Sequence, residues 1–407
     1  MLNNLPRLLL VSDANLSSQG SGINRTLVNL FNNYPPELLL LYVPQETMRT
    51  FPPIPSLAKR VVEFPLSYLN IWQNRLGKFI NPLIQSINYQ LLDWLPLANG
   101  KKIEEFNPEI ILICPNSLGC LVNSYKLVKN CQSPFLVYAM DDWISLEESY
   151  WLSANGKKVI TELLNKSAAW LMISEQLQEV FSQHYKLIPN QSLIVHNPVN
   201  LDDKEIPNFT VSHKDNFKII YAGSIWAMHY DTLVLVAQAI YELRQEGKNI
   251  ELILHTHDMF WQQYQEQWES WQVTNGKLIP YEQLNSHLQQ GDLLLVVSSF
   301  LPEYKHLTQS SLQTKLTDYM ASGKAILACG PGYSACNSFV KQWDCGLVWE
   351  TNQVSEVKEY LWKKINNQKL LNNYAHKAFD VVTNHFAKSK VSSNLYQFIQ
   401  QVSQGNT

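Results

Sequence analysis

The chain has 407 residues, too many for one ordinary hydrophobic core, so two domains are expected. Hydrophobic residues make up 45% and charged residues 16%, the profile of a globular protein with few charges and no apolar run near the ~20 residues that a membrane span needs. The net charge of −3 lacks the basic excess of a general nucleic-acid binder, so no nucleic-acid partner is expected.

Short apolar runs alternate with helical patterns in the first half of the chain. Strands are expected at residues 7–11, 38–43, 109–114, 135–140, 170–173 and 193–196, and a helix at 23–33. Continuous apolar strands separated by helices indicate a parallel sheet covered on both faces. Residues 68–97 form a long helical stretch with few charges, which could dock on the core or lie on a membrane surface.

A polar stretch at residues 198–216, with prolines at 198 and 207, predicts a linker. A second series of strands follows at residues 218–221, 251–255, 277–280, 292–297, 325–328 and 346–349. These patterns predict an α/β fold of two Rossmann-like domains, residues 1–200 and 201–385. Residues 386–407 are expected to form a helix that packs back toward the first domain.

The six cysteines form no C-x-x-C pair, and we interpret them as reduced, buried thiols. No signal peptide is evident, because Arg7 and Asp13 bracket an apolar run of only a few residues. His255 and His257 are interpreted as loop histidines, and no metal-ligand spacing is seen. A cytoplasmic location is therefore expected, with membrane contact through residues 68–97 as the open alternative.

Rossmann-like sheets bind ligands beyond the carboxyl ends of their strands, so the segments after each strand are the candidate sites. Gly20 and Gly22 follow the first strand and would let backbone amides approach an anion at a helix start. A plain flexible turn is the alternative, because the G-x-G-x-x-G spacing is absent. Asp141 and Asp142 follow the strand at 135–140, where acidic residues are often only caps.

In the second half, Gly223 and Ser224 stand between a strand and a helix near Tyr230, which suits a diphosphate as well as it suits an ordinary turn. The pattern of residues 309–328 predicts a loop, a helix that ends at a glycine, and a strand. Lys315 could reach a phosphate there, and Asp318 could accept from two ribose hydroxyls. Taken alone, this segment would also fit a capped surface helix. Hydroxyls before this helix come from Ser310, Ser311 and Thr314.

Together these segments resemble family 4 glycosyltransferases and their GT-B relatives over residues 5–385. The most specific match is TKLTDYMASGKAIL at residues 314–327, where the family carries a similar K-L-x-E-Y-M-A-x-G-K-P-I run. The resemblance implies two Rossmann-like domains with parallel sheets facing an interdomain cleft. It also implies a hexosyltransferase-like enzyme of polysaccharide biosynthesis. Such an enzyme moves a sugar from a nucleotide diphosphate-sugar to a glycan or lipid-linked acceptor, usually with retention and without metal or cofactor.

By the same resemblance, Tyr281 would lie near the base, Asp318 would bind the ribose, and Lys315 would stabilise the departing diphosphate. Asp141 and Asp142 would lie near the transferred sugar and the acceptor. The residues implied around the diphosphate are Gly20, Gly22, Gly223, Ser224, Ser311 and Thr314.

Two departures from the family stand out. Ser310 occupies the position of the first of two glutamates, the one usually placed against the donor sugar. Basic residues are also not evident after Gly223, and Lys315 could replace them. Two other hypotheses stay open: a catalytically silent GT-B binding protein, which the Ser310 substitution favours, and a nucleotide-sugar isomerase on the same fold.

Overall fold

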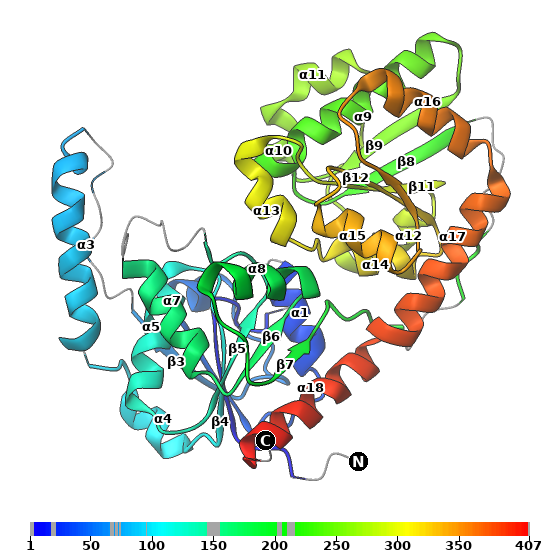
Figure 1. Ribbon diagram of the computed structural model, residues 1–407. Coiled ribbons are helices and arrows are strands. Elements are labelled where there is room, and N and C mark those ends of the chain that lie inside the picture. The colour runs from blue at the N-terminus through cyan, green and yellow to red at the C-terminus, as the bar shows by residue number, and fades with distance from the viewer. Residues whose placement is uncertain are drawn as a thin grey trace. The chain divides into compact units, whose positions relative to one another are not determined.

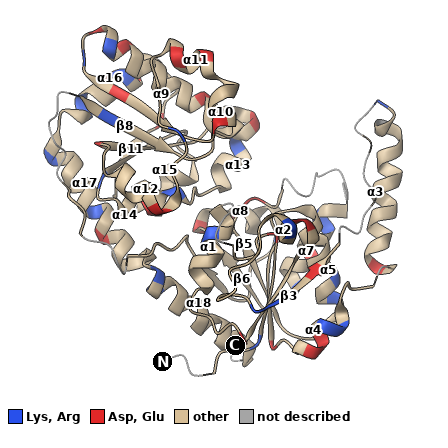
Figure 2. Cartoon of the chain, turned by 180° about the vertical axis from the view of Figure 1, so that it is seen from behind, with Lys and Arg blue, Asp and Glu red and all other residues tan. Residues whose placement is uncertain are grey.

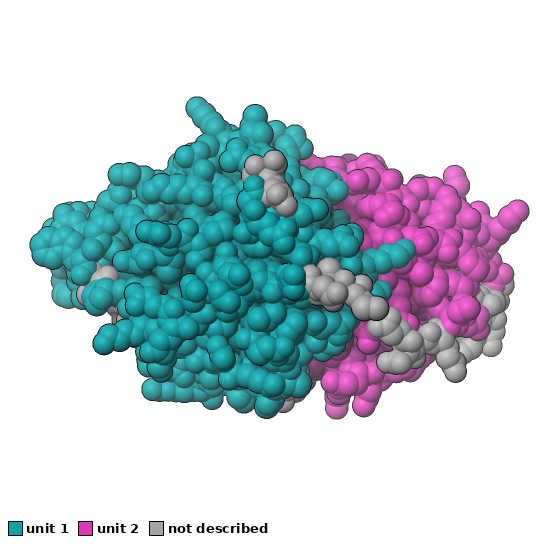
Figure 3. Space-filling view, turned by 90° about the horizontal axis from the view of Figure 1, so that it is seen from below, with its two compact units in different colours: residues 1–198, 388–407 teal, residues 199–387 magenta. Residues whose placement is uncertain are grey.

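The structure is a computed structural model that describes residues 4–17, 22–65, 69, 72, 75–94, 96–144, 155–201, 206–209 and 216–405. The chain divides into two compact units (Figure 3). Unit 1 comprises residues 1–198 and 388–407, and unit 2 comprises residues 199–387. The chain passes from unit 1 to unit 2 after residue 198 and returns to unit 1 after residue 387. The boundaries expected from the sequence were residues 200 and 385.

Unit 1 is built on a seven-stranded parallel sheet in the order β3-β2-β1-β4-β5-β6-β7 (Figure 1). Strand β1 pairs with β2 on one side and with β4 on the other, with Leu8 opposite both Leu39 and Ile110. The strands are β1 Leu8–Ser12, β2 Leu39–Pro44, β3 Arg60–Phe64, β4 Ile110–Cys114, β5 Phe135–Ala139, β6 Ala169–Met172 and β7 Ser192–Ile194. The helices are α1 Gly22–Phe31, α2 Gln45–Thr50, α3 Gly77–Trp94, α4 Gly100–Phe106, α5 Leu118–Asn130, α7 Gly156–Lys166, α8 Glu175–Tyr185 and α18 Lys388–Ser403.

Alternate residues of β1 enter different cores, so both faces of this sheet are covered, as continuous apolar strands require. Leu9 and Val11 belong to one hydrophobic cluster, and Leu8 and Leu10 belong to another. The C-terminal helix α18 packs on α1, where the Tyr396 hydroxyl donates to the carbonyl oxygen of Leu30 at 2.6 Å. The end of the chain is therefore part of the first core.

Unit 2 is built on a six-stranded parallel sheet in the order β10-β9-β8-β11-β12-β13. Its strands are β8 Phe217–Ala222, β9 Ile250–His255, β10 Thr274–Asn275, β11 Leu293–Val297, β12 Ala325–Cys329 and β13 Leu347–Trp349. Its helices are α9 Ala227–Gln245, α10 Asp258–Gln263, α11 Gln265–Ser270, α12 Tyr281–Leu288, α13 Lys305–Ser310, α14 Lys315–Ala321, α15 Ala335–Gln342, α16 Val354–Ile365 and α17 Gln368–Val381. A 3₁₀ turn, η2 Pro302–Tyr304, precedes α13, and a π-helical turn, η3 Val382–Phe386, follows α17.

Both sheets confirm the expected α/β fold, and eleven of the twelve expected strands are present within two residues of their predicted ends. The expected strand at 277–280 is wrong, because β10 lies at Thr274–Asn275 and residues 277–280 lead into α12. The edge strand β3 was not expected. It carries Arg60 and Glu63 and pairs only with β2, so it lacks the continuous apolar run of a strand buried on both faces.

Each sheet has a topological switch point, where consecutive connections reverse direction along the sheet. In unit 1 this point lies between β1 and β4, and in unit 2 it lies between β8 and β11. Open α/β sheets bind ligands beyond the carboxyl ends of the strands at such a point. The residues that follow β1, β4, β8 and β11 therefore form the candidate site region of each unit.

Candidate functional site

In unit 2, β8 runs directly into the turn Gly223–Ser224 at the switch point. Gly223 has φ of 143°, a backbone conformation that side chains rarely adopt. Its N–H donates to the carbonyl oxygen of His255, the last residue of β9, at 2.9 Å. The neighbouring strand thus holds the turn in a conformation that favours glycine.

Lys315, the first residue of α14, extends its side chain to this turn. Its Nζ lies 3.8 Å from the centroid of the Tyr221 ring. A Cβ on residue 223 would come within 2.7 Å of the same nitrogen, so any side chain there would displace the end of the lysine. The Nζ is buried and makes no hydrogen bond within the described part of the chain.

The position of this ammonium group is electrostatically unfavourable. Burial lowers the pKa of Lys315 to about 7, and the nearby Cys336 opposes the shift only in part. The face of Tyr221 offers a cation–π contact, which is a weaker partner than an anion. A buried cation without a hydrogen-bond acceptor favours binding of a negatively charged ligand.

The turn is held by three buried side chains that sequence reasoning did not include in the site. The Tyr221 hydroxyl donates to the Ser224 carbonyl oxygen at 2.6 Å. Tyr319 Oη accepts from the Ala222 N–H at 2.8 Å and lies 3.3 Å from the carbonyl oxygen of the same residue. The His229 Nδ1 lies 3.1 Å from the Ser224 carbonyl oxygen.

Burial, assisted by the positive charge of Lys315, lowers the pKa of His229 to about 3. The imidazole is therefore neutral near pH 7, and its contact with a carbonyl oxygen assigns the proton to Nδ1. A charged histidine would add a second buried cation beside Lys315. Tyr221 begins the Tyr221–Ser224 segment of the family resemblance, and His229 follows that segment by five residues. Their nearness to the segment could have identified them from the sequence.

Asp318 and Tyr281 lie together in unit 2. Tyr281 begins α12, and its hydroxyl donates to Oδ1 of Asp318, in the first turn of α14, at 3.2 Å. Tyr281 is 40% exposed and Asp318 is half-buried, so both can meet a ligand at this face. The structure thus joins the two residues that the resemblance assigned to the base and the ribose.

The hydroxyl-bearing residues before α14 have different surroundings. Ser310 is buried at the end of α13, and its Oγ donates to the His306 carbonyl oxygen of the same helix at 2.9 Å. Ser311 and Thr314 are half-buried. Gln313 fastens the segment to β11, because its Nε2 donates to the Val297 carbonyl oxygen at 2.6 Å. The loop is therefore fixed at the switch point.

The switch point of unit 1 is organised around Asp13. Its Oδ2 accepts from the N–H of Asn116 at 2.6 Å and of Ser117 at 2.9 Å, and its Oδ1 accepts from Ser117 Oγ at 2.5 Å. Burial raises the pKa of this carboxyl, and the hydrogen bonds oppose that rise. Asp13 thereby ties the end of β1 to the segment after β4.

The remaining candidates also belong to unit 1. Asp141 is exposed after β5, and its Oδ1 accepts from the N–H of Asp142 at 2.9 Å. Asp142 is buried, and its Oδ1 accepts from the N–H of Ile144 at 2.9 Å. Both carboxylates thus cap local backbone amides. Gly22 is the first residue of α1, whereas Gly20 lies outside the described residues.

No protein-family model and no curated protein matches this sequence. Solved structures do match over nearly the whole chain. HepE from Anabaena, in complex with UDP and glucose, aligns with a TM-score of 0.66 and 13% identity over 97% of this chain and 99% of that one. Sucrose-phosphate synthase from Thermosynechococcus elongatus aligns with a TM-score of 0.68 and 12% identity over 98% of this chain and 100% of that one.

A glycosyltransferase from Rickettsia africae gives a TM-score of 0.63 and 13% identity over 98% of this chain and 99% of that one. At such low identity the likeness concerns the fold and not the reaction. In this chain that fold consists of two parallel sheets with the same strand order around their switch points. The chain has the GT-B fold, as the sequence resemblance implied.

Proposed function

We propose that this protein is a family 4-like glycosyltransferase that moves a sugar from a nucleotide diphosphate-sugar to a glycan or lipid-linked acceptor. The observation that carries the proposal is the buried Nζ of Lys315, which has no hydrogen-bond partner among the described residues and lies against Gly223. A diphosphate supplies the missing negative charge, and it fits a glycine turn at a switch point. A bound anion would offset the free energy cost of burying the ammonium group, so the site would favour anions over neutral ligands.

Each part of the donor has a candidate contact in unit 2. Lys315 and the Gly223–Ser224 turn would bind the diphosphate. Asp318 would accept from the ribose hydroxyls, and Tyr281, hydrogen-bonded to Asp318 at 3.2 Å, would lie beside the base. The acceptor would be oriented by Asp141 or Asp142, which the resemblance assigns to that role.

The proposed chemistry follows from where charge develops. The bond between the anomeric carbon and the diphosphate oxygen breaks, the acceptor oxygen bonds to that carbon, and the acceptor proton passes to the departing diphosphate. Negative charge grows on the leaving diphosphate, and a fixed ammonium group stabilises that charge as it forms. Retention of anomeric configuration and independence of metal are part of the proposal, on the strength of the family resemblance.

A binding experiment tests the donor site. UDP is the first nucleotide to use, because HepE, a protein of the same fold, was crystallised with UDP and with UDP-glucose. Calorimetry should show that Asp318→Ala raises the dissociation constant for UDP or for another nucleoside diphosphate in the panel. Unchanged binding in this variant would contradict the ribose assignment.

A turnover experiment separates transfer from the alternatives. Release of free nucleotide that depends on an acceptor supports transfer, whereas conversion of the donor without acceptor would indicate an isomerase. Tight nucleotide binding without turnover would favour a silent binding protein. The Ser310 hydroxyl gives that alternative a specific basis, because it is bonded to its own helix where the family carries a glutamate.

A further inference from the structure

Helix α3 carries an apolar face that no described residue of unit 1 covers. Figures 1 and 2 show α3 standing away from the rest of its unit along most of its length, and Figure 2 shows it almost free of charged residues. Phe79 is 83% exposed, Leu83 64% and Trp94 84%. At 100° per residue these side chains fall on one side of the helix. The exposed large apolar residues of α3 and the segment before it are Leu69, Trp72, Leu76, Phe79, Leu83, Ile87 and Trp94.

The segment before α3 is clamped against this helix by two asparagine side chains. Asn88 donates to the Leu69 carbonyl oxygen at 2.9 Å and accepts from its N–H at 2.8 Å. Asn81 makes the same pair of bonds to Trp72, at 3.0 and 2.9 Å. Gly77 permits the approach, because a Cβ there would collide with the Trp72 carbonyl oxygen. We call the described residues of this segment, Leu69, Trp72 and residues 75–94, the α3 hairpin.

These clamps satisfy backbone groups that would otherwise need water. An unpaired N–H or carbonyl is costly in an apolar phase, so a segment that enters one must make its hydrogen bonds internally. Asn88 is fully buried, although Ser86, Ile87 and Gln90 beside it are exposed. The α3 hairpin therefore combines an apolar exterior with internally paired amides at Leu69 and Trp72.

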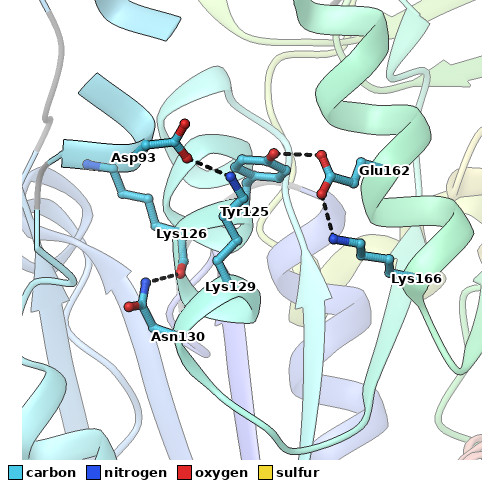
Figure 4. Close-up of polar contacts among 7 residues, drawn as sticks. All are labelled: Asp93, Tyr125, Lys126, Lys129, Asn130, Glu162 and Lys166. Atoms are coloured by element: carbon cyan, nitrogen blue, oxygen red, sulfur yellow. Dashed lines mark hydrogen bonds and ion pairs between the residues drawn. The ribbon is translucent and has the colours of Figure 1, made fainter. Parts of the chain in front are cut away.

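The base of the α3 hairpin is fixed to unit 1. Figure 4 shows Asp93 of α3 paired with Lys129 of α5 at 2.6 Å. The same lysine lies over the ring of Tyr125, whose hydroxyl donates to Glu162 of α7 at 2.6 Å. Leu92 is buried in the unit 1 core. The helix is thus anchored at its C-terminal end, and its apolar face remains open.

The charged residues of the α3 hairpin indicate which kind of partner its apolar face would bind. No Asp or Glu occurs from residue 65 to residue 92, whereas Arg75 and Lys78 are basic. The single acid of α3, Asp93, is already paired with Lys129. Trp72 and Trp94 stand at the two ends, and tryptophan favours the membrane–water boundary. An apolar face flanked by basic residues and by tryptophans favours the surface of an anionic bilayer over a neutral one.

We propose that the α3 hairpin docks on an anionic lipid surface, with Phe79 and Leu83 inserted at the boundary between headgroups and acyl chains. Among the described residues, no helix has the length and apolar character needed to cross a bilayer, so the contact is peripheral. The inference does not depend on the nucleotide site in unit 2. If both proposals hold, the enzyme would encounter a lipid-linked acceptor at this lipid surface.

Vesicle flotation tests the docking. The full chain should float with vesicles of phosphatidylcholine and phosphatidylglycerol, and less with phosphatidylcholine alone. The double variant Phe79→Ser/Leu83→Ser should lower partitioning at least ~tenfold, because two exposed apolar side chains lose their insertion energy. Arg75→Glu should weaken binding to the anionic vesicles several-fold and leave binding to the neutral ones unchanged.

The matched control is Ile188→Ser, the same type of change at a residue of unit 1 that is 90% exposed and lies outside the α3 hairpin. It should float like the unmodified chain. Absence of flotation for the unmodified chain, or equal flotation of the Phe79→Ser/Leu83→Ser variant, would overturn the proposal. So would self-association that this variant abolishes, because the face would then bind a second copy. UDP binding by the same variant should be unchanged, which separates this test from that of the donor site.

Discussion

The two switch points share one strand order but have opposite polar chemistry. In unit 1, both oxygens of the Asp13 carboxylate have hydrogen-bond donors within the protein: two backbone N–H groups and a hydroxyl. In unit 2, the Lys315 ammonium has an aromatic ring for a neighbour and no hydrogen bond among the described residues. The same topology thus carries a hydrogen-bonded carboxylate in one unit and a buried ammonium group without a hydrogen bond among the described residues in the other.

The contrast predicts that the two charges affect stability in opposite directions. Lys315→Met should weaken nucleotide binding about 10- to 100-fold, the usual effect of losing a charge-assisted hydrogen bond. The same variant should melt at an equal or higher temperature, because methionine removes a buried ammonium group without a hydrogen-bond partner. Calorimetry for binding and thermal unfolding for stability check the two effects.

The control for this variant is Lys305→Met, since Lys305 lies over the ring of Tyr333 at 5.3 Å but is exposed. It should change neither binding nor melting temperature by much. A large drop in melting temperature for Lys315→Met would show that Lys315 is a structural residue, and the contrast with Asp13 would disappear.

The pH dependence of nucleotide binding should report the same lysine. With a pKa of about 7, Lys315 loses its proton as pH rises, so the dissociation constant should increase about tenfold per unit above pH 7. Binding should take up a proton, which calorimetry in buffers of different ionisation enthalpy measures. A flat profile for the unmodified protein, or the same slope in Lys315→Met, would exclude Lys315 as the cause.

Protein stability has the opposite pH trend. The unfolded lysine keeps its proton up to its ordinary pKa of 10.5, whereas the folded one releases it near 7. Between these values the unfolded chain holds more protons, so stability of the unliganded protein rises with pH. The advantage of Lys315→Met should therefore be largest below pH 7, as thermal unfolding at several pH values would show.

Asp13→Ala tests the other side of the comparison. It should lower the free energy of unfolding by about 1–3 kcal/mol, because donors that the carboxylate satisfies would lose their acceptor. Asp13→Asn keeps one acceptor oxygen in the same place and should recover part of the loss. Denaturant unfolding measures both variants. Wild-type stability in the alanine variant would mean that water replaces the carboxylate without cost.

The smallest effect is expected at Tyr281. Tyr281→Phe removes the hydroxyl that donates to Asp318 and keeps the ring, so nucleotide affinity should fall about two- to tenfold. Asp318→Ala should cost more, since it removes the proposed ribose contact itself. If Tyr281→Phe were the more damaging change, the carboxylate would be a partner of the tyrosine and not of a ligand.

Local pattern predicted the elements of this fold well because parallel strands buried on both faces are continuous apolar runs. It was less informative at the edges of the sheets. The charged strand β3 was not anticipated, and β10 was expected several residues too late, since edge strands are short and partly exposed. For the long helical stretch, the pattern left core docking and membrane contact open, and the exposure of Phe79 and Leu83 is a property of the folded chain.

The sequence by itself determined the α/β class, the succession of strands and helices, and the helix–glycine–strand segment that bears Lys315 and Asp318. Only the tertiary structure decided which side chains have partners. Ala222 and Tyr319 are 97 positions apart yet hydrogen-bonded, and Lys315 meets Tyr221 only because β8 and α14 are folded together. Periodicity describes each element alone, whereas the burial and pairing of a charge depend on distant elements that pack around it.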